Sequence, residues 1–333
     1  MKPGLGPHVT KQEESGGHLL ARLLRDAPPW TGVGLVLVAM LVGLAFTEDL
    51  FLTYTNLNNV LRGMAIPLLM AVGSTVLLTT GMIDLSIGSL LALGTMILTG
   101  LLVVGMPGWV AVLGTMVACG LLGGGLNGLL VAKAKLSFFV VTLGTLALFR
   151  SAAQIPTGGL SVQLPESGRF VEWLGDGRVG SLSVPVVLSL SILVLSILVM
   201  RSTTFGRAVF AVGGNEHAAR LAGIPVERVR VGVFAINGVL VGLAAVVFAG
   251  RIRSGSPLVG AGIELEVIAA VLLGGTSFLG GAGSMVGTLI GVLFIAFLQN
   301  GLNLLGVQAL WQGVVTGAVL ILAVWVDRVR RPG

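Results

Sequence analysis

The sequence has few of the residues on which soluble enzymes depend. Only 10% of its 333 residues are charged, whereas an average soluble domain has about 25%. There are three histidines, one tyrosine and one cysteine, Cys119. A single thiol excludes a disulfide framework and a thiolate metal site, and no cluster of His, Cys and carboxylates has metal-ligand spacing. No nucleophile stands beside a base, so we expect neither a catalytic site nor a metal site.

A phosphate-binding loop is also missing. The G-x-x-x-x-G-K-[ST] motif needs a lysine directly after a glycine, and none of the four lysines follows a glycine. The chain therefore does not bind ATP by that route. Its formal net charge of +6 could indicate a nucleic-acid partner. The basic residues fall in short breaks between apolar runs, however, so they indicate membrane topology and we expect no nucleic acid.

What the chain has in quantity is apolar sequence. Hydrophobic residues make up 55% of it, and its mean hydropathy is +1.00. Runs of about 20 apolar residues are typical of transmembrane helices. The sequence therefore predicts an all-α polytopic membrane protein with about ten transmembrane helices. The expected segments are 31–47, 62–82, 85–105, 108–132, 137–154, 184–200, 231–250, 263–279, 283–300 and 307–326.

The distribution of basic residues predicts the orientation. With the N-terminus inside, 14 of the 20 lysines and arginines lie on the cytoplasmic side, as the positive-inside rule requires. Residues 1–30 are polar, carry no cleavable signal peptide and are expected to form a cytoplasmic tail. Residues 31–326 form the membrane domain, with an outer loop at 155–183 and a cytoplasmic loop at 201–230. Residues 327–333 form the other cytoplasmic tail.

The cytoplasmic loop contains a short predicted helix. In "NEHAARLAG", Asn215 is a candidate N-cap and Gly223 stops the helix before Pro225. An isolated helix of this length is marginal in water, so it needs a surface on this protein or on a partner.

A weak internal repeat relates the two halves of the sequence at an offset of 195 residues. The Val-Leu-Leu run at 76–78 and the Gly-Ser pair at 88–89 recur at 271–273 and 283–284. In the expected topology the two copies are parallel, and transporter folds often place the solute path between repeats. The paired glycines 274–275 and 280–281 predict a bend between two spans.

One carboxylate falls in a stretch that is otherwise apolar. Asp84 lies in "GMIDLSIGSLLALG", and three interpretations remain open. It could cap the third span by accepting from the N–H of Ile87, form a proton or cation site, or line a solute path. The topology places it at a turn near the cytoplasmic side, where we expect little burial.

Other polar residues extend the candidate site. Polar groups in lipid need partners, so these residues either form hydrogen bonds between helices or line a solute path. Glu264 and Glu266 begin the eighth span. They form either a solvated first turn or, opposite Arg251 and Arg253, an outer gate or a contact for a binding protein. The candidate path residues are Asp84, Ser86, Asn127, Asn300 and Asn303.

Several motifs together resemble a known family. They are "GMIDLSIGSLLALG", "VGGNEHAARLAGIPVERVR", "ELEVIAAVLLGGTSFLGGAGSMVGTLIG" and "NGLNLLGVQALWQGVVTGAVLILAVWVDRVRR". In these the chain is similar, over about residues 50–331, to the membrane permease subunit of ribose/xylose-type ATP-binding-cassette sugar importers of bacteria. The resemblance implies a plasma-membrane permease without catalytic activity and a monosaccharide substrate.

The resemblance also implies partners. These are a cytoplasmic ATPase that holds ATP and Mg, an extracytoplasmic sugar-binding protein and a second permease copy. The residues implied in coupling to the ATPase are Gly214, Asn215, Glu216, His217, Ala218, Arg220, Leu221 and Gly223. Because aromatics are only 6% of the chain, we expect tight sugar binding to reside in the binding protein.

Two other functions compete with this one. A secondary transporter would use Asp84 as its proton or cation site. A channel or scaffold-like membrane protein would need no ATPase partner.

Overall fold

The structure, a computed structural model, describes residues 28–330. Most of the expected tail at 1–30 and the last three residues of the expected tail at 327–333 therefore lie outside the described residues. The helices are α2 (Thr31–Thr47), α3 (Tyr54–Thr79), α4 (Ile87–Val103), α5 (Gly108–Gly120), the π-helix η1 (Leu121–Gly128), α6 (Leu129–Ala132), α7 (Phe138–Gln154), α8 (Arg169–Asp176), α9 (Val184–Ser202), α10 (Thr204–Gly214), α11 (Glu216–Leu221), α12 (Val226–Ile252), α13 (Ile263–Leu273), α14 (Met285–Leu304) and α15 (Ala309–Arg330).

Each of the ten expected segments overlaps a helix, but their lengths differ. Within residues 28–330, six helices are long and apolar enough to cross a membrane, so the chain is a multi-pass membrane protein. They comprise α3, the continuous α5–η1–α6 helix, α7 with the turn after it, α9, α12 and α14. Among the rest, α2 and α4 are shorter apolar helices, and α13 ends after 11 residues. Ten crossings therefore stay a prediction.

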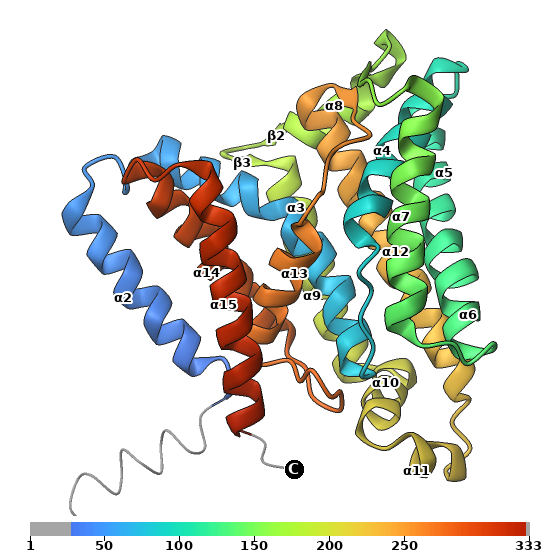
Figure 1. Cartoon of the computed structure of the whole chain (residues 1–333). Helices are drawn as coiled ribbons and strands as arrows, with labels where there is room; N and C mark the ends of the chain where they lie inside the picture. The colour runs from blue at the N-terminus through green and yellow to red at the C-terminus, as the bar shows by residue number, and fades with distance from the viewer. Residues whose placement is uncertain (1–27, 331–333) are drawn as a thin grey trace, which may run out of the picture.

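The expected outer loop is partly ordered into small elements. It contains the 3-10 turns η2 (Ile155–Thr157) and η3 (Glu166–Gly168), together with α8. The all-α expectation also needs a minor correction, because two short antiparallel ladders are present among the described residues. Strand β1 (Val162–Gln163) pairs with β4 (Ser254–Gly255), and β2 (Arg178–Val179) pairs with β3 (Leu182–Ser183). Figure 1 places α8, β2 and β3 at one end of the molecule, the α8 end, and α10 and α11 at the other, the α11 end.

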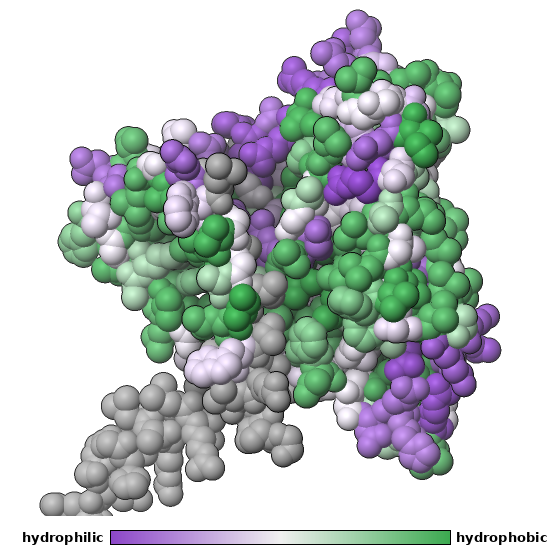
Figure 2. All heavy atoms as spheres, in the orientation of Figure 1, coloured by the Kyte–Doolittle hydropathy of each residue, from purple (hydrophilic) through white to green (hydrophobic). Residues whose placement is uncertain are grey.

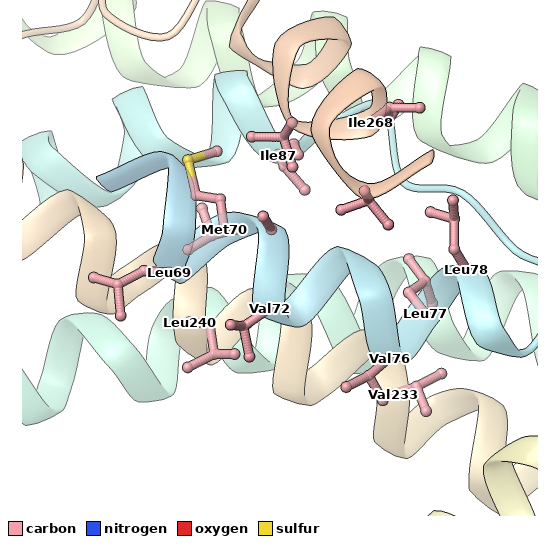
Figure 3. Close-up of a cluster of buried hydrophobic side chains, with 14 of the residues drawn as sticks. Leu69, Met70, Val72, Val76, Leu77, Leu78, Ile87, Val233, Leu240 and Ile268 are labelled. Carbon is pink, nitrogen blue, oxygen red and sulfur yellow. The ribbon is translucent and has the colours of Figure 1, made fainter. Parts of the chain in front are cut away.

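Helices α3 and α12 form the centre of the bundle. Helix α3 packs on α9, α12, α13 and α14, and α12 also packs on α4, α5, η1 and α8. Figure 3 shows their interface, in which Leu69, Val72 and Val76 of α3 lie beside Val233 and Leu240 of α12. Around this core the middle of the molecule is mainly hydrophobic, while hydrophilic side chains gather towards the two ends (Figure 2). This pattern matches a hydrocarbon belt between two aqueous faces.

Two breaks in the helices meet inside the bundle. Residues 80–86 separate α3 from α4, and residues 274–284 separate α13 from α14. The N–H of Gly281 donates to the carbonyl of Thr79 at 2.9 Å, so the two breaks are joined through their backbones. Gly280 and Gly281 have φ of +88° and +75°, which favours glycine, and a Cβ at Gly280 would lie 2.7 Å from the amide of Gly81. The expected bend at the paired glycines is confirmed; the repeat itself stays a prediction.

Candidate functional site

A cavity of about 260 Å³, the larger cavity, lies between α3, α13 and α14. Its polar lining consists of Asn59, Glu266, Gln299, Asn300 and Asn303, and aliphatic side chains of the same helices complete the wall. Because α3 contributes its first half, the cavity lies towards the α8 end. In that half, Arg62 forms an ion pair with Asp176 at the end of α8.

Polar contacts join the antiparallel helices α3 and α14 on both sides of this cavity. Near the α8 end, the side chains of Asn56 and Asn300 exchange two hydrogen bonds of 3.0 and 2.7 Å. Further along, the hydroxyls of Thr75 and Thr288 lie 2.6 Å apart. The two helices are therefore in contact at each of these polar pairs, and the larger cavity lies between the pairs.

A smaller cavity of about 100 Å³ follows towards the α11 end. Its lining includes Thr75, Thr79, Met200, Phe210 and Ser284, from α3, α9, α10 and the break before α14. The contact between Thr75 and Thr288 lies at its boundary, on the side of the larger cavity. Among the described residues, these two cavities thus follow one another along the α3–α14 seam, with the contact between Thr75 and Thr288 between them.

The Asp84 cluster, defined here as Asp84, Ser86, Asn127 and Asn237, is a separate polar site. One carboxylate oxygen of Asp84 accepts from the N–H and the hydroxyl of Ser86, at 2.8 and 2.5 Å. The amide of Asn237 donates to the other oxygen at 3.3 Å, and the amide of Asn127 donates to the Ser86 hydroxyl at 3.0 Å. The cluster thereby joins the break at residues 80–86 to η1 and α12.

Two expectations for Asp84 are wrong in detail. The side chain accepts from the N–H of Ser86, whereas the expected donor was that of Ile87. It is also 3% exposed, although little burial was expected. The reason is close packing of η1 and α3 on α12: a Cβ at Gly123 would lie 2.7 Å from the Phe234 carbonyl, and a Cβ at Gly73 would lie 2.6 Å from Asn237 Oδ1. Glycines on both sides close the space around the carboxylate.

The five candidate path residues are thus divided between two places. Asp84, Ser86 and Asn127 belong to the buried Asp84 cluster, whereas Asn300 and Asn303 line the larger cavity. Asn303 also accepts a hydrogen bond of 2.6 Å from Gln312 of α15.

The candidate gate residues lie near the α8 end but do not form the expected opposition. The Arg253 guanidinium is 3.6 Å from the Glu172 carboxylate of α8, and Arg251 donates to the carbonyl of Arg62. Glu264 accepts from the N–H of Gly262 at 3.2 Å. Glu266 instead lines the larger cavity, where its carboxyl group lies near Gln299. Arg251 therefore contacts α3 and Arg253 contacts α8.

The expected short helix is confirmed as α11. Asn215 caps it by accepting from the N–H of Ala218 at 2.9 Å, and Gly223 follows it with φ +78°. The Glu216 carboxylate binds Arg220 at 2.9 Å and Arg230 of α12 at 2.5 Å. Arg220 also pairs with Glu227 at 2.6 Å. We call these four charged side chains the α11 brace.

The α11 brace leaves other side chains of α11 free to face outwards. The brace holds the helix to α12, and the Arg220 guanidinium, with Arg230, holds the pKa of Glu216 below its ordinary value. His217, Ala218 and Leu221 are exposed, and Leu221 is 78% exposed. The candidate coupling residues therefore separate into internal bracing residues and outward-facing residues.

Sequence reasoning missed several residues of these sites. Asn237 completes the Asp84 cluster, and its signal was a lone Asn in a long apolar run. Pro67 lies inside α3 and lines the larger cavity, and an internal proline could have marked this point. The partnership of Glu216 with Arg230, 14 residues later, had no periodic signal.

Comparison with known proteins identifies the family. A family model described as the permease component of branched-chain amino acid transport systems matches residues 56–324. The chain is 42% identical over 294 residues to the ribose import permease protein of Bacillus subtilis (strain 168), covering 88% of this chain and 89% of that protein. It is 39% identical over 296 residues to the ribose import permease protein of Escherichia coli (strain K12), covering 87% and 92%.

A third relative carries another sugar in its name. The chain is 34% identical over 307 residues to an L-arabinose ABC transporter permease protein of Azospirillum brasilense, covering 90% of this chain and 88% of that protein. No solved structure matches the chain. These matches confirm the resemblance found in the sequence motifs, since ribose and L-arabinose permeases are among the relatives. The chain belongs to the family described as the permease component of branched-chain amino acid transport systems.

Proposed function

We propose that this chain is the transmembrane subunit of an ATP-binding-cassette importer and forms the path for a monosaccharide. The larger cavity carries the proposal, because it places amides and a carboxyl group beside open volume between three apolar helices, where Asn59, Gly63 and Asn303 are exposed. Polar side chains are costly in lipid unless they face protein, water or a solute. The relatives are named as ribose and arabinose permeases, which supports a pentose or related sugar as the solute.

The path runs along the α3–α14 seam. The α8 end is the outer face and the α11 end the cytoplasmic face, with both termini inside, as the basic residues predict. Sugar enters the larger cavity from outside and leaves through the smaller one, and alternating access opens the packed region at Thr75 and Thr288. Glu264, Arg251 and Arg253 lie at the outer face, where a sugar-binding protein would dock.

The outward side of α11 docks on a separate ATPase, which holds ATP and Mg. Its exposed residues His217, Ala218 and Leu221 make the contact, while the α11 brace transmits the motion to α12. Gly213 at the end of α10 packs on the Thr79 carbonyl, so movement of this region reaches the two helix breaks directly. A second copy of the chain completes the transporter. Leu221→Asp should abolish co-purification of the ATPase.

Ion-coupled transport through Asp84 is less well supported. The Asp84 carboxylate is already bound by Ser86 and Asn237 in a closed cluster. Its relatives include ribose import permeases and an L-arabinose ABC transporter permease.

The test is ATP-driven uptake of labelled ribose and L-arabinose by the reconstituted importer, with a plug in the larger cavity. Gly63 lines this cavity, and a Cβ there would meet nothing within 4 Å, so Gly63→Leu fills the cavity without a backbone clash. Uptake should fall at least about tenfold because the cavity volume is occupied. Gly144→Leu is the matched control, since Gly144 of α7 is exposed and also has nothing within 4 Å. Uptake that needs no ATP, or that Gly63→Leu leaves intact, would contradict the proposal.

A further inference from the structure

The larger cavity has a particular set of hydrogen-bonding groups. Among the described lining residues, Glu266 has the one ionisable side chain, and Asn59, Gln299, Asn300 and Asn303 supply amides. An amide both donates and accepts, and a carboxylate offers two accepting oxygens. A ring of hydroxyl groups matches this set, since each hydroxyl also donates and accepts.

The backbone of α3 adds an acceptor at the same place. Pro67 has no N–H, so it cannot donate to the carbonyl of Gly63 one helical turn earlier. Both residues line the larger cavity. Since Gly63 has no side chain, a ligand can approach this carbonyl closely.

The rest of the wall, on the same three helices, is apolar. Val60, Met64, Ala270, Val292 and Ala296 present aliphatic groups, against which the C–H face of a sugar ring can pack. The volume of about 260 Å³ lies just below the range of about 300–1,000 Å³ typical of pockets for drug-sized ligands. The space suits one small polyol.

We propose that the larger cavity binds a neutral monosaccharide during transport and that Glu266 makes it reject anionic sugars. Glu266 accepts hydrogen bonds from sugar hydroxyls while Gln299 orients its carboxylate. A second carboxylate brought into the same cavity would lie close to Glu266, and no basic side chain of the described lining would offset the repulsion. This inference rests on the proposed function and adds the substrate's charge and the residue that selects it.

A cysteine probe can report occupancy of the cavity. Cys119 is fully buried in α5, so the wild-type chain already serves as a background of low thiol reactivity. Ala296→Cys places a near-isosteric thiol in the wall of the larger cavity without removing a polar group. The permease, in complex with its ATPase, is held in lipid nanodiscs, and labelling by the uncharged reagent N-ethylmaleimide is followed by intact mass.

Protection by sugars then gives the result. Ribose, L-arabinose and D-galactose are tested beside D-galacturonate, which is galactose with a carboxylate in place of its hydroxymethyl group. We expect at least one neutral sugar to slow labelling. Where galactose protects, galacturonate should need at least about a tenfold higher concentration, because two carboxylates then share one cavity.

Two glutamine variants separate selection from general damage. Glu266→Gln should weaken protection by neutral sugars and bring galactose and galacturonate to within about threefold of each other, because the repulsion is removed. Glu264→Gln changes a neighbouring carboxylate that binds the N–H of Gly262, so it should leave the preference unchanged. Equal behaviour of the two variants, or labelling that no neutral sugar slows, would overturn the inference.

ATP-driven uptake by the same complex, reconstituted in sealed proteoliposomes with its sugar-binding protein, distinguishes the two proposals. If uptake proceeds while no sugar protects Ala296→Cys, the larger cavity is not the binding site but the importer function stands. If both uptake and protection are absent, both proposals fail.

Discussion

The Asp84 cluster and the larger cavity contain the same kinds of side chain but differ in what those side chains face. Each has one carboxyl group together with amides. In the Asp84 cluster, the carboxylate accepts from Ser86 and from the amide of Asn237, and the amide of Asn127 donates to the Ser86 hydroxyl. These contacts join η1, α12 and residues 80–86. In the larger cavity, Glu266 and four amides border open volume, although two of the amides, those of Asn300 and Asn303, also bind Asn56 and Gln312.

Two glycines of α3 explain the difference. At Gly73, beside the Asp84 cluster, a Cβ would lie 2.6 Å from Asn237 Oδ1, so α12 packs directly on the α3 backbone. At Gly63, beside the larger cavity, a Cβ would meet nothing within 4 Å. A polar residue in an apolar helix is therefore not sufficient evidence of a solute path; the packing around it decides.

Helix α11 shows the same division at the surface. Glu216, Arg220, Arg230 and Glu227 bind one another and hold the helix in place. Leu221 faces outwards without being part of that set. Polar side chains that bind one another fix the structure, whereas side chains that face a cavity or the surface remain available to a ligand or partner.

The largest effect is expected from opening the Asp84 cluster. Asp84→Ala leaves the Ser86 N–H and the Asn237 amide without their acceptor, and each buried donor costs about 1–3 kcal/mol, so unfolding should become easier by about 2–6 kcal/mol. Thermal unfolding in detergent measures this. Asp84→Asn should be far milder, since Asn237 can turn its unpartnered oxygen towards the new amide.

The Asp84→Asn variant also tests the comparison itself. If the cluster is structural, ATP-driven sugar uptake persists in Asp84→Asn at a rate that follows the amount of folded protein. Collapse of uptake in a fully folded Asp84→Asn variant would show that the cluster acts on the solute or on an ion.

The second-largest effect on stability should distinguish the two glycines of α3. Gly73→Ala overpacks the α3–α12 contact and should lower stability by about 1–3 kcal/mol. Gly63→Ala should instead keep or raise stability, by up to about 1 kcal/mol, because alanine favours a helix and meets no clash. The same thermal unfolding assay compares them. Equal destabilisation by Gly73→Ala and Gly63→Ala would mean that the space beside Gly63 is filled, which would contradict the comparison.

Hydrophobic runs were sufficient to predict most helices. The segment 108–132 coincides with the continuous α5–η1–α6 helix, and 31–47 coincides with α2. The segment 263–279 was too long, since α13 ends at Leu273 and Gly275 adopts a φ of +84°. The glycine pair marked the bend, but apolar composition alone does not reveal that a helix stops inside a bundle.

The candidate site was predicted only in part, because its geometry depends on distant contacts. Local chemistry correctly placed the Asn215 cap and the Gly223 stop of α11. It could not place Asp84 beside Asn237, which lies 153 residues later, or pair Glu216 with Arg230. Glu266 looked equivalent to Glu264 in the sequence, and only the packing of α14 brings one of them to Gln299.

A smaller effect is expected at the contact between the two cavities. Thr75→Val removes one hydroxyl of the 2.6 Å pair with Thr288, and hydrogen bonds between membrane helices are worth about 0.6 kcal/mol on average. A double-mutant cycle with Thr288→Val should give a coupling energy of that order. Thr142 bonds the Phe138 carbonyl of its own helix, so Thr142→Val with Thr288→Val should show no coupling. A coupling near zero for Thr75 would mean that the hydroxyls do not hold the seam closed.

The smallest effect concerns the α11 brace and its dependence on pH. Arg220 and Arg230 lower the pKa of Glu216 in the folded chain. Their stabilisation is therefore fully present above the ordinary glutamate pKa of about 4.3 and is lost as the pH falls through the lower folded value. Exposed ion pairs contribute only about 0–1 kcal/mol, so the change should be modest. Hydrogen–deuterium exchange of residues 216–221, corrected for intrinsic rates, should show constant protection from neutral pH to about 5 and a decline below about 4.

Two variants identify the group responsible for this decline. Glu216→Gln should remove most of the decline, since Glu216 joins α11 to Arg230 of α12. Glu227→Gln should retain most of it, because Glu227 pairs with Arg220 and leaves the contact to Arg230 intact. A decline that begins well above pH 5, or that survives in Glu216→Gln, would mean that another contact is pH-sensitive. The α11 brace would then not be what holds α11 to α12.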